Sequence, residues 1–194
     1  MTYAISFFWG IIAALGCLFF EFFIPETIRS FTFPKNNLVE LLPVISVPFI
    51  TFTAVLEESF KFLIIRKRIM KFFPDERILA GSLAAGLGFA ATELALIFFQ
   101  LKSDWTTNVS SLVEISILHI ATCGLMGYLV LKTAFKKGRL TVIVLAAALI
   151  HFLYNFSVIS GGVIINYVKT ALIFSLFVFV AGSASRIRRR LANP

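Results

Sequence analysis

Hydrophobic residues in this chain are arranged in six long runs, which short polar stretches separate. Each run has about twenty residues or more, the length that an α-helix needs to cross the hydrocarbon core of a bilayer. The pattern predicts transmembrane helices over residues 3–24, 38–65, 77–101, 110–134, 140–159 and 163–184. We therefore expect an all-α, polytopic membrane protein in which residues 1–194 form one integral membrane domain.

Prolines mark expected ends and bends in the first two runs. Pro25 is expected to end the first helix, because proline removes a backbone donor and clashes with the preceding turn. Residues 26–37 would then form a polar loop. Pro43 and Pro48 could kink the second helix, as often happens where a membrane helix lines a site, and that helix could continue to Phe73.

The third and sixth runs differ in composition. Small residues let helix backbones approach closely, so their abundance in the third run predicts a central, tightly packed helix. They are Gly81, Ser82, Ala84, Ala85, Gly86, Gly88, Ala90 and Ala91. The sixth run is the most uniformly apolar of the six after Lys169, and we expect it to face lipid.

Composition and charge also indicate a membrane protein, and the charge distribution predicts which side of the membrane each loop lies on. The chain is 59% hydrophobic with a net charge of +8, and its basic clusters follow the second, fourth and sixth runs. They comprise Arg66, Lys67, Arg68, Lys71 and Arg77; Lys132, Lys136, Lys137 and Arg139; and Arg186, Arg188, Arg189 and Arg190. The positive-inside rule then places both termini in the cytoplasm, with anionic lipids beside the basic loops. The sequence shows no nucleic-acid-binding motif.

Candidate chemistry begins with Glu57, Glu58 and Lys61, which interrupt the second run. On a helix, Glu57 and Lys61 are four residues apart and Glu58 and Lys61 three apart, so the three can share one face. An ionisable group near the bilayer centre costs a few kcal/mol, so such groups usually face a polar interior and serve a function. We expect Lys61 to be the charge partner that keeps a buried carboxylate ionised.

Polar residues on four of the runs are predicted at similar depths. Counting about 1.5 Å per helical residue from the basic clusters gives heights of about 12, 24, 20 and 18 Å for Glu58, Glu93, His119 and His151. These heights fall in the middle of a bilayer about 30 Å thick. Asn155 shares a helix face with His151. The pattern predicts one shared site.

Two kinds of chemistry suit these residue types. Glu and His in a confined, partly dry cavity can activate water, and Asn and His donors can stabilise an oxyanion. Alternatively, a divalent metal, most plausibly zinc, could be bound with one position left open for water. The candidate ligands are Glu58, Glu93, His119 and His151. No cofactor is required by the sequence.

The order of these motifs resembles the PrsW family of intramembrane proteases, which are related to CAAX-prenyl and bacteriocin-processing proteases. The motifs are Glu57-Glu58-x-x-Lys61, Phe89-x-x-x-Glu93, a lone His119, and His151-x-x-x-Asn155. The resemblance covers the second to fifth runs, about 100 residues. It implies a conical or bundled core made by those four spans, and a location in a prokaryotic plasma membrane.

The resemblance also implies an activity and roles. The activity would be hydrolysis of a peptide bond in a single-pass membrane protein or peptide, such as a membrane-anchored anti-sigma factor cut at a first, extracytoplasmic site. Glu57 or Glu58 would be the general base, assisted by Glu93. His119 would orient water or stabilise charge, and His151 with Asn155 would form the oxyanion site. Glutamate-type and metal-dependent mechanisms both stay open.

Two readings of another kind also account for charged residues in mid-membrane. A proton- or cation-coupled transporter or channel would use Glu and His as a relay, although such proteins usually show internal repeats, and none is evident here. A non-catalytic membrane scaffold could have kept a protease-like fold.

Overall fold

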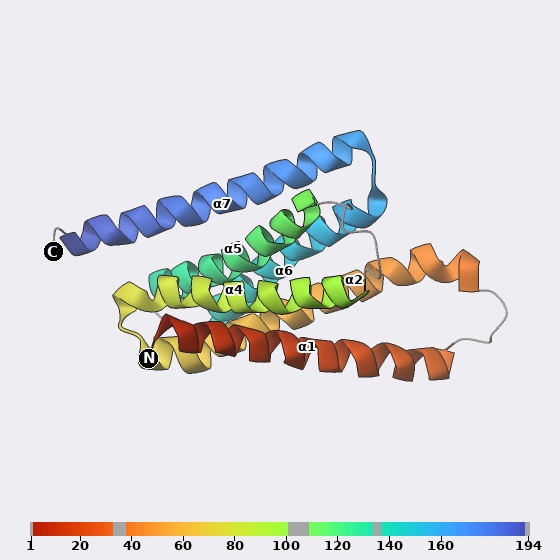
Figure 1. Ribbon diagram of the computed structural model, residues 1–194, viewed down its shortest axis with the longest axis horizontal. Coiled ribbons are helices and arrows are strands. Elements are labelled where there is room, and N and C mark those ends of the chain that lie inside the picture. Colours follow the sequence, from red (N-terminus) through yellow and green to blue (C-terminus); the bar gives the residue numbers. More distant parts are fainter. Residues whose placement is uncertain (1, 33–37, 101–108, 134–136, 193–194) are drawn as a thin grey trace.

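The computed structural model describes residues 2–32, 38–100, 109–133 and 137–192, with side chains at 2–21, 47–75, 77–99, 109–133 and 139–186. All its elements in these ranges are helices (Figure 1). They are α1 (Tyr3–Thr32), α2 (Leu38–Ile64), η1 (Ile65–Ile69), α3 (Met70–Phe72), α4 (Asp75–Gln100), α5 (Val109–Thr133), α6 (Lys137–Ser160) and α7 (Val163–Ala192).

The long helices run side by side as an elongated bundle, with the start of α1 and the end of α7 at the same end (Figure 1). Five of the helices described are long and apolar enough to cross a membrane: Tyr3–Glu21, Arg77–Phe99, Val109–Thr133, Arg139–Ser160 and Val163–Arg186. The prediction of a helical, polytopic membrane protein is therefore confirmed. The sixth span, in α2, and the side of the membrane on which the termini lie stay predictions.

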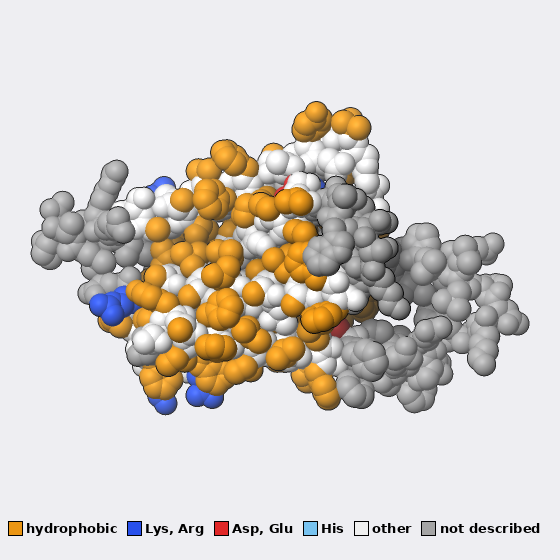
Figure 2. Space-filling model, viewed as in Figure 1, with side chains coloured by type: hydrophobic (Ala, Val, Ile, Leu, Met, Phe, Trp, Pro, Cys, Tyr) orange, Lys and Arg blue, Asp and Glu red, His pale blue; other side chains and the backbone are white. Residues whose placement is uncertain are grey.

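The surface of the bundle suits a lipid environment. Figure 2 shows hydrophobic side chains spread over the visible face, with most of the visible Lys and Arg side chains toward the end where α1 begins. On α7, Val163, Ile164 and Phe174 are each more than half exposed. These exposed apolar side chains agree with the prediction that the last helix faces lipid.

One predicted boundary is wrong. α1 does not end at Pro25 but continues to Thr32, so the expected loop begins at least seven residues late, and residues 33–37 lie outside the described part. Proline removes one intrahelical hydrogen bond, and the bonds on either side can keep a membrane helix intact. The predicted span 163–184 agrees to within two residues with the apolar segment Val163–Arg186, and the helix α7 that contains it continues to Ala192.

α2 runs through Pro43 and Pro48 without a break and is then extended by a wider turn. In this turn, η1, the Met70 N–H bonds to the Ile65 carbonyl, five residues back, and α3 follows as far as Phe72. The predicted continuation of the second helix is thus confirmed to within one residue. The wide turn buries both Ile65 and Ile69 while Arg68 lies over the ring of Trp9 on α1, with 4.3 Å from the guanidinium carbon to the ring centroid.

α4 is the tightly packed helix that its small residues predict. A Cβ on Gly10 of α1 would overlap the carbonyl oxygen of Ala85, and one on Gly88 of α4 would overlap the carbonyl oxygen of Phe7. α1 and α4 therefore touch backbone to backbone. On its other side, Gly86 lies against α5, where a Cβ would come within 2.7 Å of the His119 carbonyl oxygen.

The buried core includes α1 as well as the four helices expected to form it. Ala13, Ala14 and Cys17 of α1 belong to one cluster of buried apolar residues together with side chains from α2, α4, α5 and α6. A second cluster joins α5, α6 and α7. The sequence did not predict that α1 belongs to the first cluster.

The contact between α1 and α4 yields a stability prediction. Gly88→Ala should lower the free energy of unfolding by about 1–3 kcal/mol, because the new methyl group must push α1 away. Gly182→Ala on α7 is the control, since nothing lies within 4 Å of its Cβ position. Thermal unfolding of the detergent-solubilised variants measures the difference. Equal midpoints for the two variants would contradict the close packing.

Candidate active site

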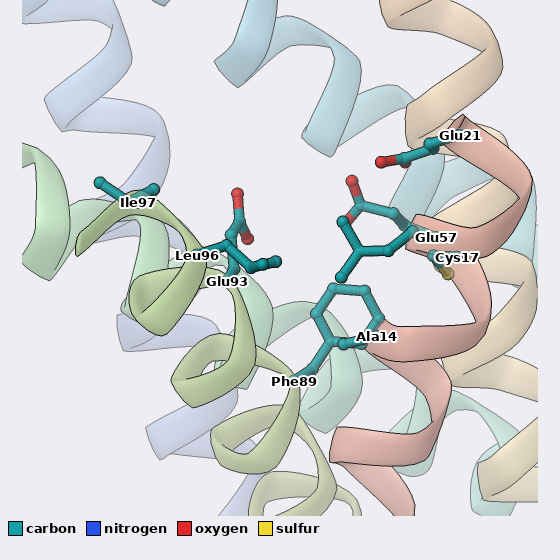
Figure 3. A pocket seen from close by; sticks show the side chains of 9 residues that line it. Ala14, Cys17, Glu21, Glu57, Phe89, Glu93, Leu96 and Ile97 are labelled. Atoms are coloured by element: carbon teal, nitrogen blue, oxygen red, sulfur yellow. The ribbon is translucent and has the colours of Figure 1, made fainter. Parts of the chain in front are cut away.

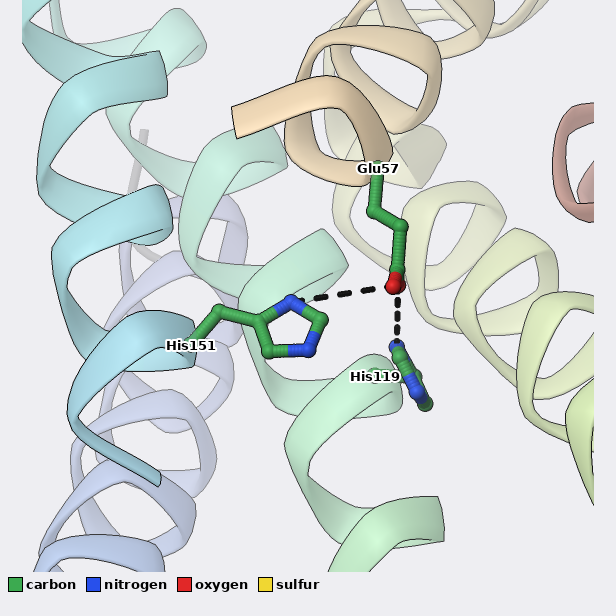
Figure 4. Close-up of side chains that lie close together, drawn as sticks. All are labelled: Glu57, His119 and His151. Carbon is green, nitrogen blue, oxygen red and sulfur yellow. Dashed lines mark ion pairs between the residues drawn. The ribbon is translucent and has the colours of Figure 1, made fainter. Parts of the chain in front are cut away.

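Six of the predicted site residues converge from four helices into one buried cluster. They are Glu57, Glu58 and Lys61 of α2, Glu93 of α4, His119 of α5 and His151 of α6. Figure 4 shows the rings of His119 and His151 on either side of the Glu57 carboxylate. The prediction that these residues share a site is therefore supported by their geometry.

Lys61 lies at the middle of the cluster and is 2% exposed. Its Nζ donates to Glu58 Oε1 at 2.6 Å and to His119 Nδ1 at 2.7 Å. Glu57 Oε2 is 3.7 Å away, and the centroid of the Phe89 ring is 4.4 Å away. The ammonium is thus held by carboxylates, an imidazole and an aromatic face.

Glu58 connects three helices through one oxygen atom. Its Oε1 accepts hydrogen bonds from Lys61, from His151 Nδ1 at 2.8 Å and from Thr122 Oγ1 at 3.4 Å. The side chain is 0% exposed. Glu57 differs, because 13% of its side chain is exposed and its Oε2 lies 3.8 Å and 3.9 Å from the Nδ1 atoms of His119 and His151. The Glu58 carboxylate is therefore closed to solvent and links α2 to α5 and α6, whereas part of the Glu57 side chain is accessible to solvent.

The hydrogen bonds also assign the histidine tautomers. An ammonium group can only donate, so Nδ1 of His119 accepts from Lys61 and the ring proton lies on Nε2. That Nε2 lies against Glu93 Oε2, so its proton is directed at the Glu93 carboxylate. An ionised carboxylate can only accept, so His151 carries its proton on Nδ1, toward Glu58. The His151 Nε2 lone pair is left for other chemistry.

A cavity of about 200 Å³ opens beside the cluster, between α1, α2 and α4. This space is large enough for several water molecules. Glu57 and Glu93 extend into it, as Figure 3 shows. The complete lining is Ala14, Cys17, Leu18, Glu21, Glu57, Phe89, Glu93, Leu96 and Ile97. Water can therefore reach two carboxylates of the cluster.

Two features of the site differ from what the sequence suggested. Glu21 of α1, which belongs to none of the sequence motifs, lines the cavity. Its signal was the same as that of Glu57, an acid inside an apolar run, but the rotation of α1 about its axis could not be read from the sequence. Asn155 is half-buried on α6, one turn beyond His151, and within the described chain it makes no hydrogen bond or ion pair to the cluster.

A metal ion could be held by Glu57, His119 and His151. Each offers one ligand atom, and these atoms lie within 4.8 Å of one another. One carboxylate and two imidazoles are ligands typical of zinc, and three protein ligands leave a position open. Glu57 Oε2 has no hydrogen-bond partner in the part of the chain described, which also fits this use.

This group contains Glu57 in place of the expected Glu58 and Glu93. Glu58 Oε1 is already bonded to Lys61 and His151, whereas Glu93 faces His119 from the other side. A metal on His119 Nδ1 would need that nitrogen's lone pair, which now accepts from Lys61. Lys61 would then have to donate to its carboxylates alone.

The family model for PrsW family intramembrane metalloprotease matches residues 1–182. The chain belongs to the PrsW family. No curated protein and no solved structure is significantly similar to it. The match is wider than the resemblance noted in the sequence, because it includes α1 and most of α7 as well as the helices that carry the motifs. This PrsW protein is therefore an integral membrane peptidase, and its helices assemble the motif residues around one cavity.

The buried pair of Lys61 and Glu58 yields a second prediction for this PrsW protein. Lys61→Met should lower the free energy of unfolding by about 3–5 kcal/mol, because it leaves Glu58 buried without its cation. The double variant Lys61→Met with Glu58→Gln should regain much of that loss. Thermal unfolding of the wild type, the two single variants and the double variant gives the coupling energy. Additive single effects would show that the pair is not coupled.

Proposed function

We propose that this PrsW protein hydrolyses a peptide bond of a membrane-anchored substrate with water that Glu57 activates. The observation that carries the proposal is the position of the Glu57 carboxylate, between the water-accessible cavity and the two histidines. Of the three glutamates in the cluster, only Glu57 both lines the cavity and lies beside the two histidines. Glu58 is fully buried, and Glu93 lines the opposite wall of the cavity. The geometry thus favours Glu57 over Glu58 as the base.

In the proposed reaction, Glu57 takes a proton from water as the water oxygen attacks the peptide carbonyl carbon. The C–N bond then breaks, and the proton passes to the leaving nitrogen, as general acid–base catalysis requires. A base must lie within hydrogen-bond reach of its proton, and a water in the cavity can meet this requirement at Glu57.

The other residues would position the base and stabilise charge. Glu58 holds Lys61 and the His151 ring in place through its Oε1 atom. Glu93 contacts the Nε2 side of His119 and would assist at the water. Asn155, one turn beyond His151 on α6, would donate its side-chain amide to the carbonyl oxygen as negative charge develops on it, and His151 would join it once its Nε2 carries a proton.

The family's description as a metalloprotease supports a metal-assisted form of this proposal. A zinc ion held by Glu57, His119 and His151 would supply a Lewis acid and lower the pKa of its bound water. In that case Glu57 would be a ligand, and its role as proton acceptor would fall to another carboxylate at the cavity, Glu93. The metal-free and metal-assisted forms of the mechanism differ in the role of Glu57, and analysis of the metal content of the protein can distinguish them.

The substrate is proposed to be a single-pass membrane protein or peptide, with a membrane-anchored anti-sigma factor as one candidate. The cavity lies among membrane-spanning helices, so the cleaved bond must lie in or next to the membrane. The second half of α1 and the end of α4 line this space. In the predicted topology those segments approach the extracytoplasmic side, which agrees with cleavage outside the cytoplasm.

An activity test follows for the protein reconstituted in liposomes with a single-pass Leu/Ala-rich peptide. Glu57→Gln should reduce kcat/KM by about 10²–10⁴-fold, because general acid–base catalysis contributes that much. Glu93→Ala and His151→Ala should also lower the rate. Glu114→Gln, on α5 and paired with Lys169 away from the site, is the control. Full cleavage by all three site variants would refute the protease proposal, and no cleavage combined with a Glu93-dependent proton flux would favour a transporter.

A metal test separates the two forms of the mechanism. If Glu57, His119 and His151 hold zinc, the purified protein should contain about one zinc per chain, and His151→Ala should lose it. A chelator should then abolish cleavage, and added zinc should restore it. Elemental analysis of the wild type, His151→Ala and Glu114→Gln checks the stoichiometry. Full activity of a protein without metal would show that Glu57 acts as the base.

A further inference from the structure

Glu21 lines the same cavity as Glu57 and Glu93 of the catalytic cluster. It lies on α1 beside Leu18, and Figure 3 shows the carboxylates of Glu21, Glu57 and Glu93 pointing into the same space. They come from three different helices. The carboxylate of Glu21 is therefore directed at whatever occupies the cavity.

Among the residues that the structure describes, Glu21 has no ion-pair partner. Its Oε1 is buried without a hydrogen-bond partner, and no described Lys, Arg or His forms an ion pair with it. Lys61 is engaged by Glu58 and His119. A carboxylate oxygen that is buried without a partner is costly, so a cation that enters the cavity would be favoured there.

Glu114 shows how the same fold treats an acidic residue without such a role. It lies in the apolar run of α5, and its Oε2 is 2.7 Å from Lys169 Nζ on α7. Thr170 Oγ1 donates to its other oxygen at 3.3 Å. Glu114 is thus paired within the protein, whereas no described residue pairs with Glu21.

The resident metal site does not account for Glu21. In the part of the chain described, the group that could hold an ion is Glu57, His119 and His151, and Glu21 is not a member. Among the described residues no resident cation accounts for Glu21, so a cation that arrives with the substrate is the candidate partner. The rest of the lining suits the aliphatic part of a long basic side chain, because Leu18, Leu96 and Ile97 are apolar.

We infer that Glu21 is a specificity-determining residue, which selects substrates with a Lys or Arg side chain next to the cleaved bond. The inference rests on the proposed function, since the cavity must be the place where the peptide binds. The ammonium or guanidinium group would lie between Glu21 and Glu93, and the stem would lie along the apolar wall. A charge-assisted hydrogen bond of this kind is about twice as strong as a neutral one.

The test uses the whole protein in liposomes with the single-pass Leu/Ala-rich peptide, whose cleaved bond is located by mass spectrometry. Each position flanking that bond then carries either Lys or Met, which have similar length but differ in charge. At one position the Lys peptide should be cleaved with a kcat/KM about 10- to 100-fold higher than that of the Met peptide. Glu21→Gln should reduce this ratio to about one. Glu21→Lys should instead favour the peptide with Glu at that position.

Leu18→Ala is the matched control, because it enlarges the same wall without removing a charge. It should change the rates for the Lys and Met peptides together and keep their ratio. Equal cleavage of the Lys and Met peptides by the wild type would overturn the inference and leave the proposed function intact. Failure of the wild type to cleave any peptide would overturn both. Loss of metal on Glu21→Gln would make Glu21 a metal ligand and would also overturn the inference.

Discussion

The ion pair between Lys61 and Glu58 is the interaction on which the site depends. An ammonium and a carboxylate buried together in a membrane protein are tolerated only when their remaining donors and acceptors are also satisfied. Here that requirement brings in His119 of α5 and His151 of α6, so one pair on α2 joins three helices. Glu57, the next residue to Glu58, is left free to face the cavity.

Much of this arrangement could be predicted from the sequence, because position along a helix fixes depth in a membrane. Counting residues from the basic clusters placed Glu58, His119 and His151 in one layer, and they do meet. The count could not show which of Glu57 and Glu58 faces the cavity. Neighbouring residues differ by about 100° around the helix axis, and the packing of α5 and α6 against α2 settles that angle.

The direction in which Glu21 points depends in the same way on the rotation of its helix, α1, about the helix axis. Glu21 belongs to none of the sequence motifs, and it lines the cavity in a fold in which α1 packs closely against α4. The helix boundary at Pro25 was wrong for a different reason. A proline disfavours a helix locally, but the neighbouring turns of a long membrane helix can outweigh that preference.

The backbone contacts of Gly10 with Ala85 and of Gly88 with Phe7 bear on how the cavity can change its width. Because α1 and α4 touch without intervening side chains, no side chain between them can repack to let them part. α2 is the remaining wall, and it packs against α1 and α6. A movement of α2, the helix that carries Glu57, would widen the cavity and leave the contact between α1 and α4 intact. In such a movement, binding of a substrate and alignment of the base would occur together.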